Sequence, residues 1–287
     1  MNTRICFLSS PSGNANSNHE LLPRAFQKAG WLVSLVPQEQ VNLTPAGIQL
    51  GALKPQDLDL IWLLGFGERQ SCIDRFQILS HLDDSLFVTP PLTMLHLHAK
   101  PTLCQGPLQH LFLPGWVSGD TTWLKNRILS GGEWVIKPTA SSYGQQVFKV
   151  SGDSQNLNMI LESVTRHGYA LLQKYLEAAE QGEKRVLIAN GKIIGFYLRT
   201  STEHFRSNLS AGAESTTCSL TVGDTKMVNE VMHYLSQSKV RFAAIDIVAN
   251  HVMEINVANP GGLQTLHDLT HEDAALATAL SFSYKQP

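Results

Sequence analysis

The sequence predicts a mixed fold, with an α/β part followed by α+β parts, and three observations support this. Short apolar segments alternate with helical segments from residue 5 to residue 88, which is typical of a parallel sheet. Later pairs of apolar segments are joined by the turns Asn190-Gly191 and Asn250-His251, which favour antiparallel hairpins. The length of 287 residues allows a substantial core and, as a soft prior, two domains.

The N-terminal elements follow the alternation of a parallel α/β unit. Strands are expected at residues 5–9, 31–36, 58–64 and 86–88, and helices at residues 18–28 and 73–82. In such sheets ligands meet the loops that follow the carboxyl ends of the strands. Loops 10–17 and 65–69 are therefore candidate substrate loops, although for each loop alone a plain connection is the simpler interpretation.

The middle of the chain begins with a helical connector, residues 91–117, that prolines interrupt. The expected strand 134–137 ends in Lys137 and is followed by a loop of small residues and a strand at 147–150. Such a loop can fold over phosphates and donate backbone N–H groups, and a lysine at its edge supplies a point charge. Most Ser/Gly loops are simple turns, so this loop alone is weak evidence.

The elements that follow are expected to complete the antiparallel part. A helix at 157–166 and a strand at 170–173 precede the hairpin 183–200, and amphipathic or apolar helices are expected at 225–238 and 272–281. The polar, small-residue segment 203–213 has the composition of a mobile lid.

The hairpin of residues 242–257 carries the clearest chemical signal. Asp246 is the one charged residue in an apolar strand, and a buried carboxylate is costly unless a cation or a donor meets it. Glu254 and Asn256 lie two residues apart and share one face of the returning strand, and Asp246 can lie across from them. These hard oxygen ligands suit Mg²⁺. The alternative, a hairpin whose polar residues face water, fits less well, because solvated faces favour Lys, Thr and Gln.

The composition narrows the class of protein. Hydrophobic residues make up 43% and charged residues 16% of the chain, and the formal net charge is −2. This near balance gives no support to nucleic-acid or membrane-surface binding. The four cysteines are far apart without metal-binding spacing, so free thiols in a reducing compartment are expected. We find no signal-peptide core and no apolar run of membrane-spanning length, which predicts a cytoplasmic protein.

Five segments together resemble the ATP-grasp superfamily and, within it, the bacterial type of glutathione synthetase. They are residues 134–138 with the following loop, 172–176, 182–187, 206–212, and 246–257 with Pro260. The resemblance is specific from about residue 100 to residue 266. It implies a pre-ATP-grasp parallel α/β domain at residues 1–95, a small lid domain with its connector at 96–175, and a C-terminal α+β domain at 176–287. ATP would lie between the last two.

The resemblance also implies roles for individual residues. Lysines would contact phosphates, the segment around Tyr175 would form the hinge at adenine, and Glu183 would bind the ribose. The nucleotide set is Lys100, Lys137, Ser141, Ser142, Gly144, Gln173, Lys174, Tyr175, Leu176 and Glu183. Asp246, Glu254 and Asn256 would hold Mg²⁺, or Mn²⁺ in its place. The catalytic set is Arg185, Arg206 and Asn208, and the substrate-binding set is Asn256, Pro260, Gly261 and Gly262.

The implied activity is an ADP-forming carboxylate–amine ligase that works through an acyl phosphate, such as the joining of γ-glutamylcysteine to glycine or another amine. Small-molecule substrates are expected, and family members are often dimers or tetramers. Where glutathione enzymes carry an Arg-Lys-Asp-Pro-Pro type motif, this chain has residues 64–69, Leu-Gly-Phe-Gly-Glu-Arg. Two alternatives therefore stay open: a ligase for a different amino acid, peptide or protein tail, and a non-catalytic nucleotide-binding module.

Overall fold

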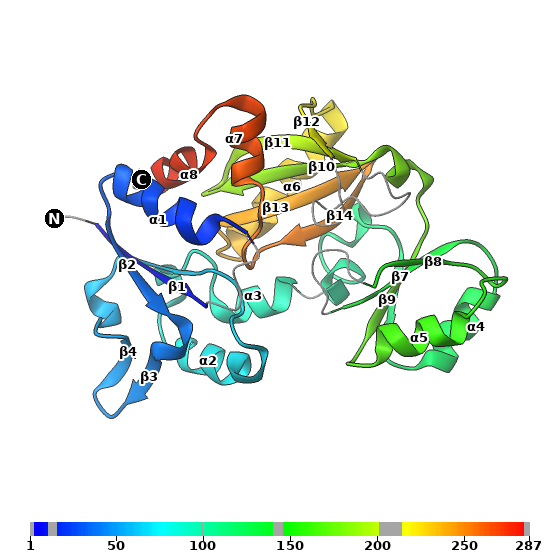
Figure 1. The fold of residues 1–287 in the computed structure, drawn as a ribbon, viewed down its shortest axis with the longest axis horizontal. Coiled ribbons are helices and arrows are strands. Elements are labelled where there is room, and N and C mark those ends of the chain that lie inside the picture. The colour runs from blue at the N-terminus through cyan, green and yellow to red at the C-terminus, as the bar shows by residue number, and fades with distance from the viewer. Residues whose placement is uncertain (1–2, 11–15, 99, 140–145, 201–213, 284–287) are drawn as a thin grey trace.

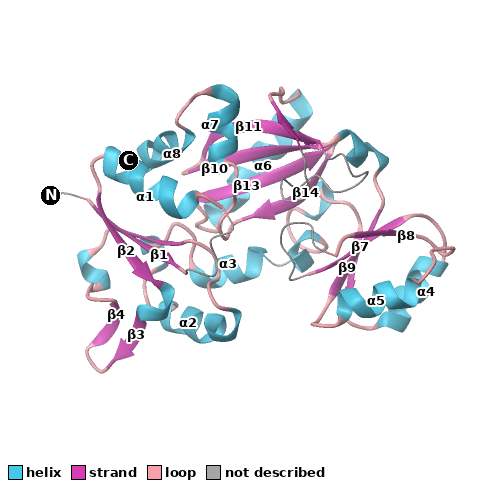
Figure 2. Cartoon of the chain, viewed as in Figure 1, coloured by secondary structure: helices cyan, strands magenta, loops and turns pink. Residues whose placement is uncertain are grey.

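The residues that the computed structural model describes form three β-sheets of three or more strands and a small separate hairpin (Figures 1 and 2). The structure describes residues 3–10, 16–98, 100–139, 146–200 and 214–283. In this part of the chain no helix is long and apolar enough to cross a membrane.

The N-terminal sheet is parallel, as the alternation of strands and helices predicted, with the strand order β2-β1-β5. Its apolar central strand is buried from Ile5 to Leu8. The elements of this part are β1 (Arg4–Ser9), α1 (Asn18–Lys28), β2 (Leu32–Pro37), β5 (Leu60–Leu63), α2 (Cys72–Leu79) and α3 (Pro91–His98). A hairpin that the sequence did not predict, β3 (Val41–Thr44) with β4 (Gly47–Leu50), projects from it.

The predicted strand at residues 86–88 is wrong. Asp84–Leu86 forms a 3₁₀ turn, and only Phe87 bridges to Ile61 of β5. The Asp83 side chain accepts a hydrogen bond from the Ser85 amide at 2.7 Å, which stabilises the turn in place of a strand.

The small lobe at the right of Figure 1 is an antiparallel sheet with the order β6-β9-β7-β8, covered by two helices. It has its own core, in which Trp134, Ile136 and Leu172 pack against Leu124 and Leu161 of the helices. Its elements are β6 (Gly115–Ser118), α4 (Thr121–Leu129), β7 (Trp134–Pro138), β8 (Phe148–Val150), α5 (Leu157–Thr165) and β9 (Ala170–Lys174).

The largest sheet is antiparallel, with the order β12-β11-β10-β13-β14. Val186 and Ile245 belong to the core cluster that contains the helix α6, whereas Leu187 and Ala244 belong to the cluster that contains α7 and α8. The helices therefore cover opposite faces of the sheet. Its elements are β10 (Glu183–Ala189), β11 (Lys192–Thr200), β12 (Glu214–Thr216), α6 (Val222–Gln237), β13 (Phe242–Val248), β14 (His251–Asn256), α7 (Leu263–Thr270) and α8 (Ala274–Ser283).

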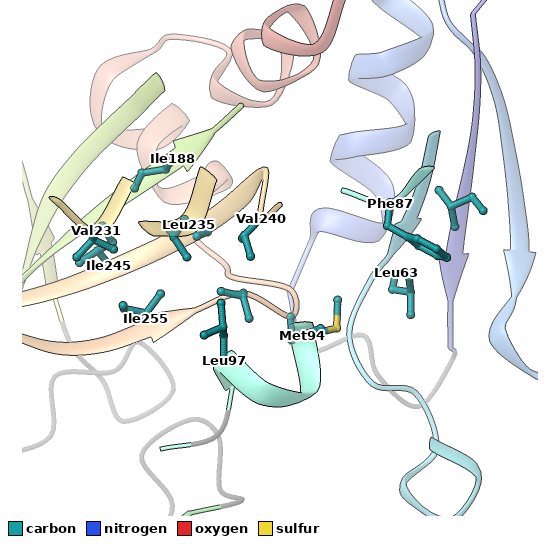
Figure 3. Close-up of a cluster of buried hydrophobic side chains, with 14 of the residues drawn as sticks. Leu63, Phe87, Met94, Leu97, Ile188, Val231, Leu235, Val240, Ile245 and Ile255 are labelled. Carbon is teal, nitrogen blue, oxygen red and sulfur yellow. The ribbon is translucent and has the colours of Figure 1, made fainter. Parts of the chain in front are cut away.

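The N-terminal part and the largest sheet share their core. The rings of Trp62 and Phe242 lie 5.0 Å apart, and the Arg241 amide donates to the Val88 carbonyl at 2.8 Å. Figure 3 shows Leu63 and Phe87 on one side of this core and Leu235 and Ile255 on the other, with α3 between them. These two parts therefore pack as one body, and the small lobe with its separate core projects from it.

Candidate active site

One face of the largest sheet carries a row of charged side chains of both signs. Glu183 pairs with Arg199 across β10 and β11, Arg185 pairs with Asp246 across β10 and β13, and Asp246 pairs with Glu254 across β13 and β14. Residues directly opposite each other in a sheet point to the same face. We call these five residues the charged row; it lies on the same face as Leu187 and Tyr197, beyond the area that α7 and α8 cover.

Two β-bulges place the five charged side chains on the same face of the sheet. The register shifts by one residue between Leu187 and Ile188, and again between Asp246 and Ile247. Without the second shift, Asp246 would lie opposite Met253 and Glu254 would face the α6 side of the sheet. A bulge changes the face of every residue beyond it, so the bulges place Arg199 and Glu254 beside the other charges.

Asp246 is the centre of the row, with only 3% of its side chain exposed. Its Oδ1 accepts hydrogen bonds from Arg185 Nε at 2.8 Å and lies 3.1 Å from Arg199 Nη2. Its Oδ2 accepts from Arg185 Nη2 at 2.8 Å and from Asn256 Nδ2 at 3.2 Å. A carboxylate offers about four lone-pair sites, and here all four have a partner.

These contacts shift the pKa of each partner. Burial acts to raise the pKa of Asp246, but the charges of Arg185 and Arg199 outweigh it and lower the pKa to about 2. Burial likewise opposes the charge on Arg185, and Asp246 more than compensates, so the pKa of the guanidinium is raised. Burial raises the pKa of Glu183, although Arg199 pairs with it. Asp246 therefore stays ionised at neutral pH.

Arg199 is a site residue that the sequence did not predict. It is 4% exposed and contacts both Glu183 and Asp246. The signal was an arginine near the end of an otherwise apolar hairpin strand, since a buried guanidinium requires acidic partners.

Two predicted phosphate-binding lysines lie near Glu254, at the β14 end of the charged row. Lys100 Nζ lies 3.6 Å from Glu254 Oε1 and 3.5 Å from the carbonyl oxygen of Thr139, so the connector, the residue that follows β7, and β14 meet there. Lys137, at the end of β7, interacts electrostatically with Glu254 and Lys100. Burial lowers the pKa of Lys137, and Glu254 opposes this shift. The lysines predicted to act on the nucleotide therefore converge on a predicted metal ligand.

The predicted adenine hinge lies at the end of β9. Gln173 is 3% exposed, whereas Lys174 is exposed and its Nζ lies 3.7 Å from the centre of the Trp134 ring. The Tyr175 hydroxyl bonds Glu180 and its amide donates to the Glu133 carbonyl at 3.0 Å. The side chains of Lys174 and Tyr175 thus have partners within or beside the lid, which leaves backbone groups, including those of Leu176, as the hinge contacts that the resemblance implies.

The segment from Asn259 to Gly262, which we call the glycine loop, approaches the row from the side of β14. Arg185 Nη1 donates to the Gly261 carbonyl at 3.3 Å, so one guanidinium holds both the loop and Asp246. Pro260 is buried, and the two glycines are partly buried. The predicted substrate-binding residues therefore lie next to the predicted catalytic Arg185.

Gly262→Ala should destabilise the folded protein. Gly262 has a φ of +129°, and a Cβ there would lie 2.7 Å from the Tyr197 hydroxyl. Strain of this kind costs about 1–3 kcal/mol, which urea unfolding would measure. The matched change Gly223→Ala, in a helix where a Cβ meets nothing closer than 3.7 Å, should not lower the free energy of unfolding.

Five predicted site residues lie outside the described residues: Ser141, Ser142, Gly144, Arg206 and Asn208. Their assignments stay predictions, as does the lid expected at residues 203–213.

The predicted metal ligands lie together and have suitable atom types. Asp246 and Glu254 are opposite each other, and the Asn256 amide bonds Asp246. The described residues contain no group of three or more His, Cys, Asp or Glu side chains that could hold a metal ion, so a metal ion bound here would need the carboxamide oxygen of Asn256 as its third ligand. Hard oxygens of this kind fit Mg²⁺. For the ion to bind Asp246, at least one of the N–H groups that now donate to its oxygens would have to move away.

Sequence comparison places this geometry in a family. A sequence model described as the ATP-grasp domain of prokaryotic glutathione synthetase matches residues 103–271. The glutathione synthetase of Prochlorococcus marinus is 28% identical over 169 residues, which are 58% of this chain and 55% of that protein. That of Gloeobacter violaceus is 34% identical over 135 residues, 46% of this chain and 42% of that protein. The matches thus span about half the length of these curated relatives.

Solved structures match the whole chain. D-cycloserine synthetase DcsG has a TM-score of 0.72 and 14% identity, and covers 98% of this chain and 100% of its own. The ATP-grasp ligase PsnB, complexed with a minimal precursor, has a TM-score of 0.71 and 13% identity, and covers 99% of each chain. At this identity the likeness concerns the fold, and it confirms the predicted ATP-grasp architecture.

Proposed function

The chain belongs to the family of prokaryotic glutathione synthetase ATP-grasp domains, and we propose on this basis that it is an ADP-forming ligase that joins a carboxylate to an amine. The observation that carries the proposal is the charged row, in which Asp246 lies between two arginines and opposite Glu254. Lys100 and Lys137 face Glu254 from the connector and the lid.

The proposed reaction explains why so much positive charge is gathered there. A carboxylate is a poor acyl donor, so its oxygen first takes the γ-phosphoryl group of ATP, which gives an acyl phosphate and ADP. The amine nitrogen then attacks the carbonyl carbon, so the C–N bond forms as the C–O bond to phosphate breaks; phosphate leaves, and the nitrogen loses one proton, which the phosphate can accept. Phosphoryl transfer depends on alignment and charge neutralisation, which Lys100, Lys137, Arg185 and Arg199 would supply.

The same proposal assigns Mg²⁺, or Mn²⁺, to Asp246, Glu254 and Asn256, where the ion would neutralise phosphate charge. The side chain of Glu254 is 31% exposed and has Lys100 as its cationic partner, so it is more accessible than Asp246. Arg185 and Arg199 fill the oxygens of Asp246. A shift of either arginine toward the phosphates would open Asp246 and place a cation beside the transferring group.

Two candidate classes of substrate follow from the comparisons. By analogy with the glutathione synthetases, the first candidate pair is γ-glutamylcysteine and glycine. A peptide or protein carboxylate is the second candidate, since PsnB, which covers 99% of this chain, is complexed with a precursor.

One observation favours a donor other than γ-glutamylcysteine. The loop after β5 lacks the motif of the glutathione enzymes, and Arg75 fills the space behind it, where it bonds the Phe66 carbonyl and the Ser71 hydroxyl. Arg75 is 4% exposed, so its charge serves the loop and not a ligand. The loop would therefore contact a donor through residues other than those of that motif.

ADP release across a panel of donors and acceptors tests the proposal. The panel combines γ-glutamylcysteine, free amino acids and acidic peptides with glycine and other amines, and mass spectrometry identifies the product. ADP should form only when a matching donor is present. ATP binding without ADP release for every donor would instead support the non-catalytic nucleotide-binding module. Cytoplasmic location and a homo-oligomer stay predictions.

A further inference from the structure

The N-terminal part of the chain holds the glycine loop through two asparagines. Asn18 begins α1 and is 1% exposed. Its Nδ2 donates to Asn259 Oδ1 at 2.8 Å and to the Pro260 carbonyl at 2.9 Å. Asn16 Nδ2 donates to the Asn259 carbonyl at 2.8 Å. Three hydrogen bonds thus join residues that are more than 240 positions apart.

The opposite side of the loop is held by the charged row. Arg185 donates to the Gly261 carbonyl while the same guanidinium binds Asp246 in a bidentate pair. The loop is therefore fixed between the N-terminal part, at Asn259 and Pro260, and the candidate catalytic residues, at Gly261.

Asn18 is suited to this role by its chemistry. A carboxamide carries two N–H donors, and Asn18 uses its amide nitrogen on two separate oxygens of the loop. At 1% exposure water does not replace a lost partner readily, so breaking these bonds leaves buried acceptors unsatisfied. The loop position is consequently sensitive to this single side chain.

We propose that Asn18 is a positioning residue for the amine acceptor: it fixes the glycine loop at the distance from Arg185 and Asp246 at which the amine meets the activated carboxylate. This inference rests on the proposed function, and it adds that the N-terminal part controls acceptor binding through the loop. A displacement of about 1 Å is enough to cost a large part of the rate when two reacting groups have to be aligned. Nucleotide binding, proposed between the charged row and the small lobe, does not depend on Asn18.

Asn18→Asp tests the proposal, because it keeps the size of the side chain and replaces the donor with an oxygen that faces two loop oxygens. The KM for the amine acceptor should rise about tenfold, while the Kd for ATP, measured by calorimetry, should stay within about twofold. Amide hydrogen exchange of residues 257–262 should become about tenfold faster.

Thr278→Val is the matched control. It removes a buried hydroxyl that bonds the Ala274 carbonyl within α8, so it costs stability without contact with the loop. Asn18→Asp with unchanged loop exchange, or with the same small kinetic changes as Thr278→Val, would overturn the proposal. The exchange measurement needs no turnover, so it shows whether Asn18 holds the glycine loop even if no donor and acceptor pair reacts and the proposed function fails.

Discussion

Asp246→Asn should abolish ADP release in the presence of the correct donor and should also destabilise the folded protein. The neutral amide removes the negative charge that the buried Arg185 and Arg199 share. Its NH₂ group would also face N–H donors of these arginines in place of a carboxylate oxygen that accepts from them. Breaking a buried ion pair from one side costs about 3–5 kcal/mol. Turnover assays and urea unfolding measure the two effects separately.

The pH dependence of stability provides a second test of Asp246. Its pKa in the folded protein is about 2, below the ordinary value of 3.8, so ionised Asp246 stabilises the fold. This contribution, about 2 kcal/mol, is fully present above about pH 4 and is lost as the pH falls toward the folded-state pKa. The side chain introduced by Asp246→Asn does not titrate, so the variant should lose less stability than the parent protein over this acidic range. Glu183 has a raised pKa and acts in the opposite sense.

Asp224→Asn is the matched control for this prediction. Asp224 is similarly buried and pairs with Lys184 at 2.7 Å, but Lys184 follows Glu183 on β10 and faces the α6 side of the sheet. Asp224→Asn should lower the free energy of unfolding and leave nucleotide-dependent turnover intact. A fully active Asp246→Asn variant, or loss of turnover in both variants, would contradict the central role of Asp246.

The sequence was sufficient where a pattern is local. Glu254 and Asn256 share a face because side chains in a strand alternate, whereas the position of Asp246 opposite Glu254 also needs the bulge between Asp246 and Ile247. The parallel N-terminal sheet followed in the same way from alternating elements. The family resemblance then supplied the lysines, which the structure places beside Glu254.

The sequence did not predict site residues whose position depends on strand register or on packing between distant segments. From the Asn190-Gly191 turn alone, Glu183 would pair with Leu198, and the bulge at Leu187 shifts the partner to Arg199. A bulge has no reliable local signature, so Arg199 was missed. The contact of Asn18 with Asn259 joins distant segments, and no periodicity relates them.

Lys137→Gln should weaken ATP binding by about thirtyfold, because a charge-assisted hydrogen bond contributes about 2 kcal/mol. Lys137 lies at the end of β7, where Glu254, Lys100 and Asp246 act on it electrostatically, and burial lowers its pKa without a carboxylate in a direct ion pair among the described residues. A phosphate group would supply the anion that this ammonium lacks. Isothermal titration calorimetry with a non-hydrolysable ATP analogue measures the change.

The matched control is Lys125→Gln, which removes one positive charge from α4 of the same lobe. If Lys137 acts only through the net charge of the lid, both variants should bind nucleotide equally well, and the effect should disappear in high salt. Direct contact predicts the opposite: only Lys137→Gln loses affinity, and the loss persists in about 0.5 M salt, where the Debye length is only a few ångströms. Unchanged affinity in Lys137→Gln would remove this lysine from the nucleotide site.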